Sequence, residues 1–219
     1  MILFKKLSMP IRRTLLFFIL IPVLFSCSGD INQKVIIVFE KPPTLKQEQE
    51  LVLNLSSQTS KTNLSKFLSN QNWIKSYLIK KYAFQPLEVF IETKDPKYIW
   101  QDRFYLDADL TKFLYFGEYP ELLHLYIPIE LVDRWSQVED QMQAVMEAYN
   151  LKIFSVSYSE AAGWTFYTAN KLQINLGSDL SFNVFQKLSL TLKYIFEKNL
   201  TPSIIDLRYK DGAALNYGK

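Results

Sequence analysis

The strongest hydrophobic signal in the sequence is one apolar run close to its start. Residues 14–29 contain no charged side chain, and their centre reads LLFFILIPVLF. Residues 1–13 before it are basic and contain no acidic side chain. Because a basic flank before an apolar segment stays in the cytoplasm, we expect a cytoplasmic tail at 1–13, a membrane segment at 14–29 and an exported remainder. The residues that would set this topology are Lys5, Lys6, Arg12 and Arg13.

Three interpretations of the apolar run stay open on its sequence alone. It fits a retained single-pass anchor, although a full span needs about 20 residues; Arg12 and Arg13 would then extend their charged ends to the interface. It also fits a cleaved signal peptide, which has the same layout. A lipoprotein signal is the third interpretation, because Cys27 follows Leu24-Phe25-Ser26, where the bulky Phe25 stands in place of a small residue.

Residues 30–95 show the alternation of a small α+β unit. The uncharged run VIIVF at 35–39 predicts a buried strand, and Leu64, Phe67 and Leu68 are spaced as on one face of a helix. We therefore expect helices on one face of a three-stranded sheet. The expected order is a strand at 35–39, a segment at 45–55 that fits either a helix or a strand, a helix at 63–70, and strands at 74–82 and 87–93 joined by a turn at 84–86.

Residues 96–219 predict a second, β-rich domain with flanking helices. A stripe that includes Val132, Trp135 and Met142 predicts one helix over 131–150. Asp211-Gly212 predicts the tight turn of a final hairpin, with a positive φ at Gly212. The other expected elements are short strands or a loop at 100–113, a connector at 118–128, strands at 151–157, 164–168 and 171–176, a helix at 181–198, and hairpin strands at 203–209 and 213–217.

Composition excludes several classes of function. The 219 residues include 25 basic and 22 acidic ones, a formal net charge of +3. Without the four bases of the tail, 21 bases face 22 acids, so the exported part has no basic excess for binding nucleic acid. A single Cys excludes an internal disulfide, a single His excludes a multi-histidine metal site, and both counts weigh strongly against a Cys/His catalytic pair. We therefore expect no enzyme activity, no metal, no cofactor and no small-molecule substrate.

For the residues whose side chains are often catalytic or ligand-binding, we expect structural roles instead. The single histidine, His124, is expected to lie in a loop and to be solvated or hydrogen-bonded. Asp206 and Arg208 are two residues apart on one predicted strand, and we expect them to form a local pair. The adjacent carboxylates Glu139 and Asp140 are expected on a solvated helix face. The tryptophans expected in the cores are Trp73, Trp100, Trp135 and Trp164.

Motifs at the end of the chain are the most specific. Residues 172–177 read LQINLG, an amphipathic helix follows, and residues 205–214 read IDLRYKDGAA. Trp164 precedes Gly177 by thirteen residues. With these motifs the chain resembles the FtsQ/DivIB family of bacterial cell division proteins, whose endings contain a similar LGR…DLRY-x-G-x-A pattern.

The resemblance extends over nearly the whole length. Residues 72–74 (NWI) and 86–89 (PLEV) are similar to two steps of the family's first exported module, as is Asp95-Pro96 followed by Trp100. The chain departs from the family where Leu110 replaces a glycine and Tyr217 replaces a tryptophan, so it resembles a diverged member.

The resemblance implies an architecture and a role. It implies a transmembrane anchor at 14–29, a POTRA-type module at 30–95 and an FtsQ-type β domain at 96–219. The protein would be a non-enzymatic scaffold of the divisome in the cell inner membrane, single-pass, with its bulk in the periplasm and enriched at the septum. Its implied partners are FtsB and FtsL, with other division proteins docking on the POTRA-type module.

The expected partner site is the last strand of the chain. Because the sequence stops soon after residues 213–217, this strand can lie at a sheet edge, where a partner strand satisfies its free N–H and C=O groups. Tyr209 and Tyr217 would serve as aromatic anchors, although packing of Tyr209 in the core is an open alternative. Carried over from the family, the partner surface comprises Tyr209, Asp211, Gly212, Ala213, Ala214, Asn216 and Tyr217.

Two other functions stay open on the sequence. One is a periplasmic or surface lipoprotein attached through Cys27. The other is a POTRA-bearing assembly or transport factor, although such proteins usually carry several modules or a following barrel. A hydrolase is disfavoured, because the sequence offers no nucleophile and base in a recognisable arrangement.

Overall fold

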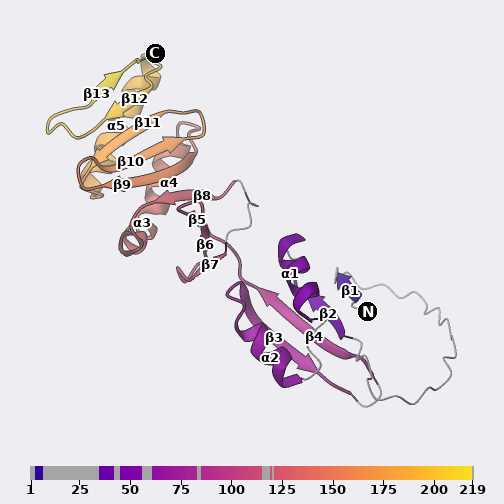
Figure 1. Ribbon diagram of the computed structural model, residues 1–219. Coiled ribbons are helices and arrows are strands. Elements are labelled where there is room, and N and C mark those ends of the chain that lie inside the picture. Colours follow the sequence, from indigo (N-terminus) through magenta and orange to yellow (C-terminus); the bar gives the residue numbers. More distant parts are fainter. Residues whose placement is uncertain are drawn as a thin grey trace, which may run out of the picture. The chain divides into compact units, whose positions relative to one another are not determined.

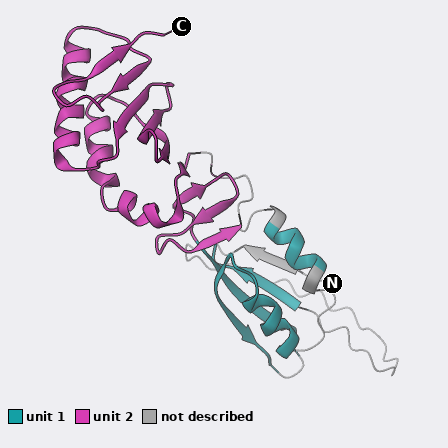
Figure 2. Cartoon of the chain, turned by 60° about the vertical axis from the view of Figure 1, so that its left-hand side comes forward, with its two compact units in different colours: residues 1–94 teal, residues 95–219 magenta. Residues whose placement is uncertain are grey.

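The computed structural model describes residues 3–6, 35–41, 45–55, 61–82, 85–114, 119 and 121–218. The chain divides into two compact units, residues 1–94 and 95–219, shown in two colours in Figure 2. Each unit combines a β-sheet with helices, so the expected α+β class is confirmed (Figure 1). Within the described residues, no helix is both long and apolar enough to cross a membrane. The expected anchor at 14–29 lies outside them, as do Arg12, Arg13 and Cys27.

Unit 1 contains a four-stranded sheet in the order β1-β2-β4-β3. β2 runs parallel to both β1 and β4, and β3 is antiparallel to β4. The segment at 45–55, which fitted either a helix or a strand, is a helix. The elements are β1 (Leu3–Lys6), β2 (Val35–Phe39), α1 (Leu45–Leu55), α2 (Lys61–Ser69), β3 (Ile74–Lys80) and β4 (Leu87–Thr93).

Strand β1 was not expected, so the prediction of a three-stranded sheet is wrong by one strand. It comes from the segment assigned to a cytoplasmic tail and contains Lys5 and Lys6, whose Cα atoms pair with Val38 and Phe39. Four residues carry too little periodicity to predict a strand; pairing with β2 makes this one. The assignment of residues 1–13 to the cytoplasm stays a prediction.

The core of unit 1 lies between one sheet face and its helices. Alternate residues of the parallel strands, such as Ile37 and Val89, are fully buried. Leu51 of α1 and Leu64 of α2 are buried as well. Trp73, which precedes β3, is fully buried, as expected for a core tryptophan. Burial of these apolar side chains stabilises the unit by removing them from water.

Unit 2 contains a nine-stranded sheet in the order β13-β12-β11-β10-β9-β8-β5-β6-β7. Strand β8 is parallel to its neighbours β5 and β9, β11 is parallel to β12, and the other neighbours are antiparallel. The strands are β5 (Tyr98–Trp100), β6 (Phe104–Leu106), β7 (Lys112–Leu114), β8 (Leu123–Tyr126), β9 (Ile153–Ser159), β10 (Gly163–Thr168), β11 (Gln173–Gly177), β12 (Ile204–Asp206) and β13 (Ala214–Asn216). The helices are η1 (Ile129–Leu131), α3 (Val132–Ser136), α4 (Glu139–Glu147) and α5 (Phe182–Glu197).

Residues 118–128 were expected to form a connector, and this prediction is wrong for the β8 residues. Strand β8 lies inside the sheet, with Leu123 and Leu125 buried on the core side. Its apolar and polar residues alternate over only four positions, between Pro120 and Pro128. The alternation is too short to predict a strand without its neighbours.

The prediction of a single helix over residues 131–150 is also wrong, because the structure has two helices there, α3 and α4, with a break between them. Ser136 and Gln137 donate side-chain hydrogen bonds to Asp133, the first to its carbonyl oxygen at 2.8 Å and the second to its carboxylate at 2.8 Å. The Ser136 bond occupies a backbone carbonyl of the helix, and local bonds of this kind compete with the regular helical ladder. Val138 then lies at φ −112°, with its N–H bonded to the carbonyl of Trp135. The bend leaves buried residues on both α3 and α4.

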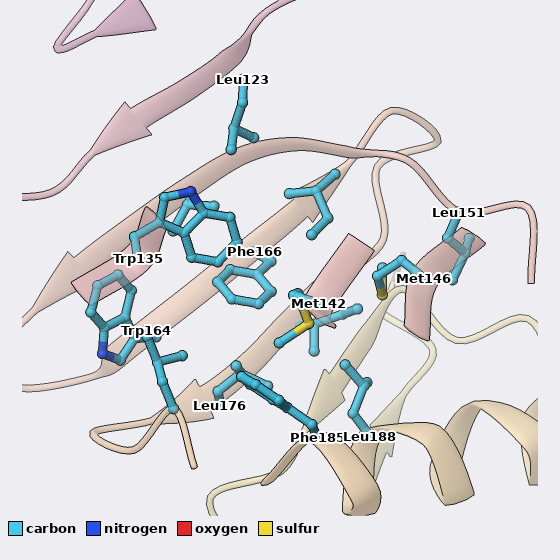
Figure 3. Packing of buried hydrophobic residues seen from close by; sticks show 14 of the residues in the cluster. Leu123, Trp135, Met142, Met146, Leu151, Trp164, Phe166, Leu176, Phe185 and Leu188 are labelled. Carbon is cyan, nitrogen blue, oxygen red and sulfur yellow. The ribbon is translucent and has the colours of Figure 1, made fainter. Parts of the chain in front are cut away.

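The helices of unit 2 share one apolar cluster with one face of the sheet (Figure 3). Trp135 of α3 packs edge-on against Phe166 of β10, with ring centroids 5.2 Å apart. Met142 of α4 and Leu188 of α5 are fully buried in the same cluster, and so is Trp164. The expectation that tryptophans are core residues is confirmed for Trp73, Trp135 and Trp164, whereas Trp100 is half-buried.

Glu139 corrects the expectation of a solvated carboxylate at the start of α4. Its side chain is only 13% exposed. It accepts a hydrogen bond from the hydroxyl of the buried Tyr98 at 2.5 Å and lies 3.2 Å from Lys97 Nζ. Burial, together with the nearby Glu139 carboxylate, raises the pKa of Tyr98. The contact fastens β5 to α4.

Two glycines approach each other where β10 pairs with β11. Gly163 and Gly177 have φ angles of +72° and +85°, which only glycine adopts readily. A Cβ atom on Gly163 would lie 2.1 Å from the backbone carbon of Gly177. The glycine of the LQINLG motif therefore allows close contact between the two strands at an irregularity in their register.

Candidate partner-binding site

Strand β13 is a border strand whose outer edge has no partner strand in the described part of the chain. On its inner side Leu215 pairs with Ile205 of β12 in antiparallel register. No residue of β13 carries a charge. The backbone groups of an open edge can bond to a further strand, and charged side chains, lysine above all, normally prevent this.

The other three border strands of the two sheets all contain lysine. They are β1 and β3 in unit 1 and β7 in unit 2. Lys112 of β7 lies over the ring of Phe104 with its ammonium 4.4 Å from the centroid. Among the described border strands, β13 alone lacks a charged side chain.

A bidentate ion pair fixes the exit from β12. Arg208 donates from Nε to Asp206 Oδ1 at 2.9 Å and from Nη2 to Oδ2 at 2.6 Å. The local pair expected from the sequence is therefore confirmed. Hydrogen bonds from Arg208 hold the pKa of Asp206 below its usual value. At neutral pH both groups are charged, and the pair holds the start of the loop between β12 and β13.

Lys187 of α5 fastens the same loop to the helix. Its ammonium group donates hydrogen bonds to the carbonyl oxygens of Leu207, at 2.9 Å, and of Tyr209. Charge-assisted bonds of this kind are stronger than those between neutral groups. The loop that leads to β13 is thus held at both its start and its middle.

An open hollow of about 510 Å³ lies between α5 and the hairpin. Leu190 and Tyr194 form the helix wall and are 69% and 53% exposed. Ala213 and Leu215 form the opposite wall, at and beside the border strand. The hollow therefore offers apolar surface directly beside the open backbone edge of β13.

The structure gathers all the predicted partner-surface residues in this hairpin. Asp211, Gly212 and Ala213 line the hollow, and Ala214 and Asn216 belong to β13. Tyr209 and Tyr217 are 60% and 53% exposed, so the alternative that Tyr209 packs in the core is wrong.

The predicted tight Asp-Gly turn is wrong in its details. The loop between β12 and β13 runs over residues 207–213, and Gly212 does not have a positive φ. A Cβ atom on Gly212 would meet nothing within 4 Å. The longer loop needs no left-handed residue at this position.

The helix wall is the part of the site that the sequence analysis missed. Lys187, Leu190 and Tyr194 lie off the buried stripe of α5, which contains Leu188 and Leu192. The available signal was the presence of large apolar residues on the polar side of an amphipathic helix. It was overlooked because single apolar residues on a surface are common.

The single histidine forms a separate polar cluster. His124 Nδ1 lies 2.9 Å from Asp102 Oδ1, and the hydroxyl of Tyr126 donates to the same carboxylate. The expected hydrogen-bonded role is confirmed, but His124 lies on β8 and not in a loop. Within the described residues no three His, Cys, Asp or Glu side chains are grouped so that they could bind a metal ion.

Comparisons with known proteins show that the chain is similar in sequence to a cell division protein. No family model matches it. It is 22% identical over 157 residues to "Cell division protein FtsQ" of Aliivibrio fischeri. The alignment covers 66% of this chain and 57% of that protein, so the chain spans little more than half of its relative's length. The similarity supports a distant relationship to FtsQ.

Proposed function

We propose that this protein is a non-enzymatic scaffold of the bacterial divisome that binds an FtsB-type partner by strand addition at β13. The observation that carries the proposal is the uncharged border strand beside an exposed apolar hollow. It is supported by the distant similarity to FtsQ and by the position of the DLRY motif, which leads into this hairpin.

The partner would bind in two ways at once. Its extended segment pairs with the outer backbone groups of β13, which supplies affinity, and its side chains select position and register. An apolar side chain enters the hollow between Leu190, Tyr194 and Leu215. Tyr209 and Tyr217 border the site as exposed aromatic anchors, a residue type enriched among binding hot spots.

The wider role follows the same model. Residues 14–29 anchor the chain in the inner membrane as a single-pass segment, with the two units in the periplasm. Unit 1 acts as a POTRA-type module for other division proteins, and FtsL joins through the complex with FtsB. Lys5, Lys6, Arg12 and Arg13 keep the N-terminal side in the cytoplasm.

The test removes the apolar wall without touching the core. Leu190→Asp places a charge in the hollow at a side chain that is 69% exposed, so the fold is retained. We expect capture of the host's FtsB-type protein to fall at least about 30-fold, because a buried unpaired charge at a hot spot costs about 2–4 kcal/mol. Phe182→Asp is the matched control: it lies on the same helix, is 66% exposed and does not line the hollow.

Two results would contradict the proposal. Equal capture by the Leu190→Asp and Phe182→Asp proteins would show that the partner does not bind at the hollow beside β13. Depletion of the protein from its host should produce filaments, and normal septation after depletion would remove the division role altogether.

A further inference from the structure

The central strands of unit 2 carry no charged side chain. Strands β8, β9, β10 and β11 are neighbours in the middle of the nine-stranded sheet (Figure 1), and none of them contains Asp, Glu, Lys or Arg. One face of these strands packs in the apolar cluster with the helices. The other is called the outer face here. In unit 1, by contrast, strand β4 alone carries Glu88 and Glu92.

The outer face is uncharged but polar. Its residues alternate along the strands with core residues such as Leu125, Phe166 and Ile174. The strand register aligns them in two rows that cross the sheet. One row contains Tyr126, Ser157, Thr165 and Asn175, and the other contains His124, Ser155, Tyr167 and Gln173. The face therefore presents hydroxyl, imidazole and amide groups.

Hydrogen bonds within the outer face fix the orientation of its polar groups. Asn175 Oδ1 accepts a hydrogen bond from Thr165 Oγ1 at 3.3 Å and another from Gln173 Nε2 at 2.8 Å. The Tyr126 hydroxyl donates to Asp102 Oδ2 at 2.9 Å. Because side chains that are already ordered lose little entropy on binding, the face is preorganised for a polar ligand.

Two exposed aromatic rings stand on this polar face. Phe154 is an extra residue in β9, because the pairing with β10 passes from Ser155 to Ile153 without it. Bulges of this kind re-aim a side chain, and here the Phe154 ring stacks on His124, with centroids 4.9 Å apart and planes at 29°. Phe154 and Tyr167 are 46% and 39% exposed. Both rings adjoin the small side chain of Ser155, which follows Phe154 and pairs with Tyr167.

The composition of the outer face limits what it can bind. Its four strands are interior strands of the sheet, so they have no open backbone edge for strand addition. Nucleic acid and anionic lipid bind basic side chains, which these strands lack. The carboxylates at its two borders, Asp102 and Asp206, both accept hydrogen bonds within the molecule. An apolar helix would bury the hydroxyl and amide groups without partners, which is costly. The face is complementary to an uncharged ligand that has both hydroxyl groups and apolar ring faces.

We infer that the outer face of strands β8 to β11 binds an uncharged, linear, β-linked polysaccharide. The C–H faces of its sugar rings pack on the negatively polarised faces of aromatic rings, here Tyr167 and the Phe154–His124 stack. Its hydroxyl groups bond to the hydroxyl and amide groups of the two rows. Four strands extend over about 14 Å, which accommodates a few sugar units. The site lies on the other side of the sheet from α5 and its hollow beside β13.

The first experiment measures binding of defined saccharides to the full chain by isothermal titration calorimetry, in a detergent without a sugar head group. Cellohexaose and the hexamer of β-1,4-linked N-acetylglucosamine offer an uncharged ribbon without and with acetamido groups. We expect at least one of them to bind with a dissociation constant of about 1 mM or tighter. The hexamer of β-1,4-linked mannuronate carries a carboxylate on every ring and should bind at least about fivefold more weakly, because the face offers no cation. Absence of binding by both uncharged hexamers, or equal binding by the charged one, would overturn the inference.

The second experiment locates the binding on the outer face. Tyr167→Ala and Phe154→Ala each remove an exposed ring and should weaken binding of the uncharged hexamer about fivefold. Tyr82→Ala and Phe182→Ala are the matched controls, because they remove rings that are 52% and 66% exposed outside this face, and they should leave binding unchanged. Tyr167→Phe keeps the ring and should retain most of the binding. Equal effects of the two pairs of variants would show that the saccharide binds elsewhere.

The outcome is independent of the β13 site. Leu190→Asp should reduce capture of the FtsB-type partner and leave saccharide binding unchanged. Failure of saccharide binding with intact partner capture would reject this inference alone, and the reverse result would reject the proposed partner site alone.

Discussion

The two sheets differ in size, yet their borders follow one rule. The four-stranded sheet of unit 1 has lysine in both border strands, because β1 covers the uncharged β2. The nine-stranded sheet of unit 2 has lysine at β7 and none at β13. Of the two uncharged strands, β2 is paired with β1, whereas β13 lies at a border beside the apolar hollow of α5. Edge composition, more than any catalytic group, is what supports the proposed partner site at β13.

The largest effect is expected on the stability of unit 2, from a substitution that disrupts only its nine-stranded sheet. Gly163→Ala puts a Cβ atom 2.1 Å from the backbone of Gly177 and forces a positive φ on alanine. We expect a loss of at least about 3 kcal/mol in the unfolding free energy of unit 2, measured by urea denaturation. Gly212→Ala, which meets nothing within 4 Å, should leave stability within about 0.5 kcal/mol of the native protein. Equal stability of the two variants would contradict the close strand contact.

A second change makes the β13 border resemble the other borders. Ala214→Lys adds a lysine to an exposed position of the strand, as at β7 and β3. We expect capture of the FtsB-type partner to weaken about tenfold, because an edge lysine disfavours strand addition. Lys112→Ala on β7 is the matched change at the other border and should leave capture unchanged. If capture weakens equally in both variants, edge charge does not select the site.

A third change loosens the hairpin while keeping the border uncharged. Lys187→Met removes two hydrogen bonds to the loop carbonyls and retains most of the side-chain volume. We expect a loss of about 1–3 kcal/mol in stability and faster amide exchange in residues 207–213, with weaker partner capture. Lys193→Met, whose ion pair with Glu197 is exposed, is the control and should change neither. Unchanged exchange after Lys187→Met would show that the loop is held by other contacts.

The smallest effect concerns the Asp206–Arg208 pair. Asp206→Asn removes an ion pair in which the Asp206 side chain is 15% exposed and the Arg208 side chain 47% exposed, and we expect the melting temperature to fall by a few degrees at pH 7. Because the pKa of Asp206 is lowered in the fold, its stabilisation is present above the ordinary carboxyl pKa and is lost as pH falls through the lowered value. The difference between the native protein and the variant should therefore shrink in acid. A difference that grows in acid would contradict the direction of the pKa shift.

Several elements could be predicted because their signal is local. Strand β2 follows from VIIVF, and α5 follows from an apolar stripe at helical spacing. The Asp206–Arg208 pair follows from a spacing of two in sequence, although only Asp206 belongs to β12. In each case the residues that decide the structure are neighbours in sequence, so pattern alone is sufficient.

Other elements could not be predicted, because partners distant in sequence decide them. Strand β8 alternates over four residues and becomes a strand through β5 and β9. Strand β1 depends entirely on β2. The break before α4 is local, but no proline or glycine marks it: the Ser136 hydroxyl bonds back to the Asp133 carbonyl, and the Val138 N–H bonds to the carbonyl of Trp135.

The candidate site divides in the same way. The sequence by itself determined the absence of charge in β13, and its resemblance to the FtsQ/DivIB family predicted the partner residues between 209 and 217, because both are properties of one continuous segment. Only the tertiary structure decided that Leu190 and Tyr194 face this segment across a hollow and that Lys187 holds the loop. A helix reveals its buried stripe through periodicity, but the use of its outer face depends on which strand the fold places beside it.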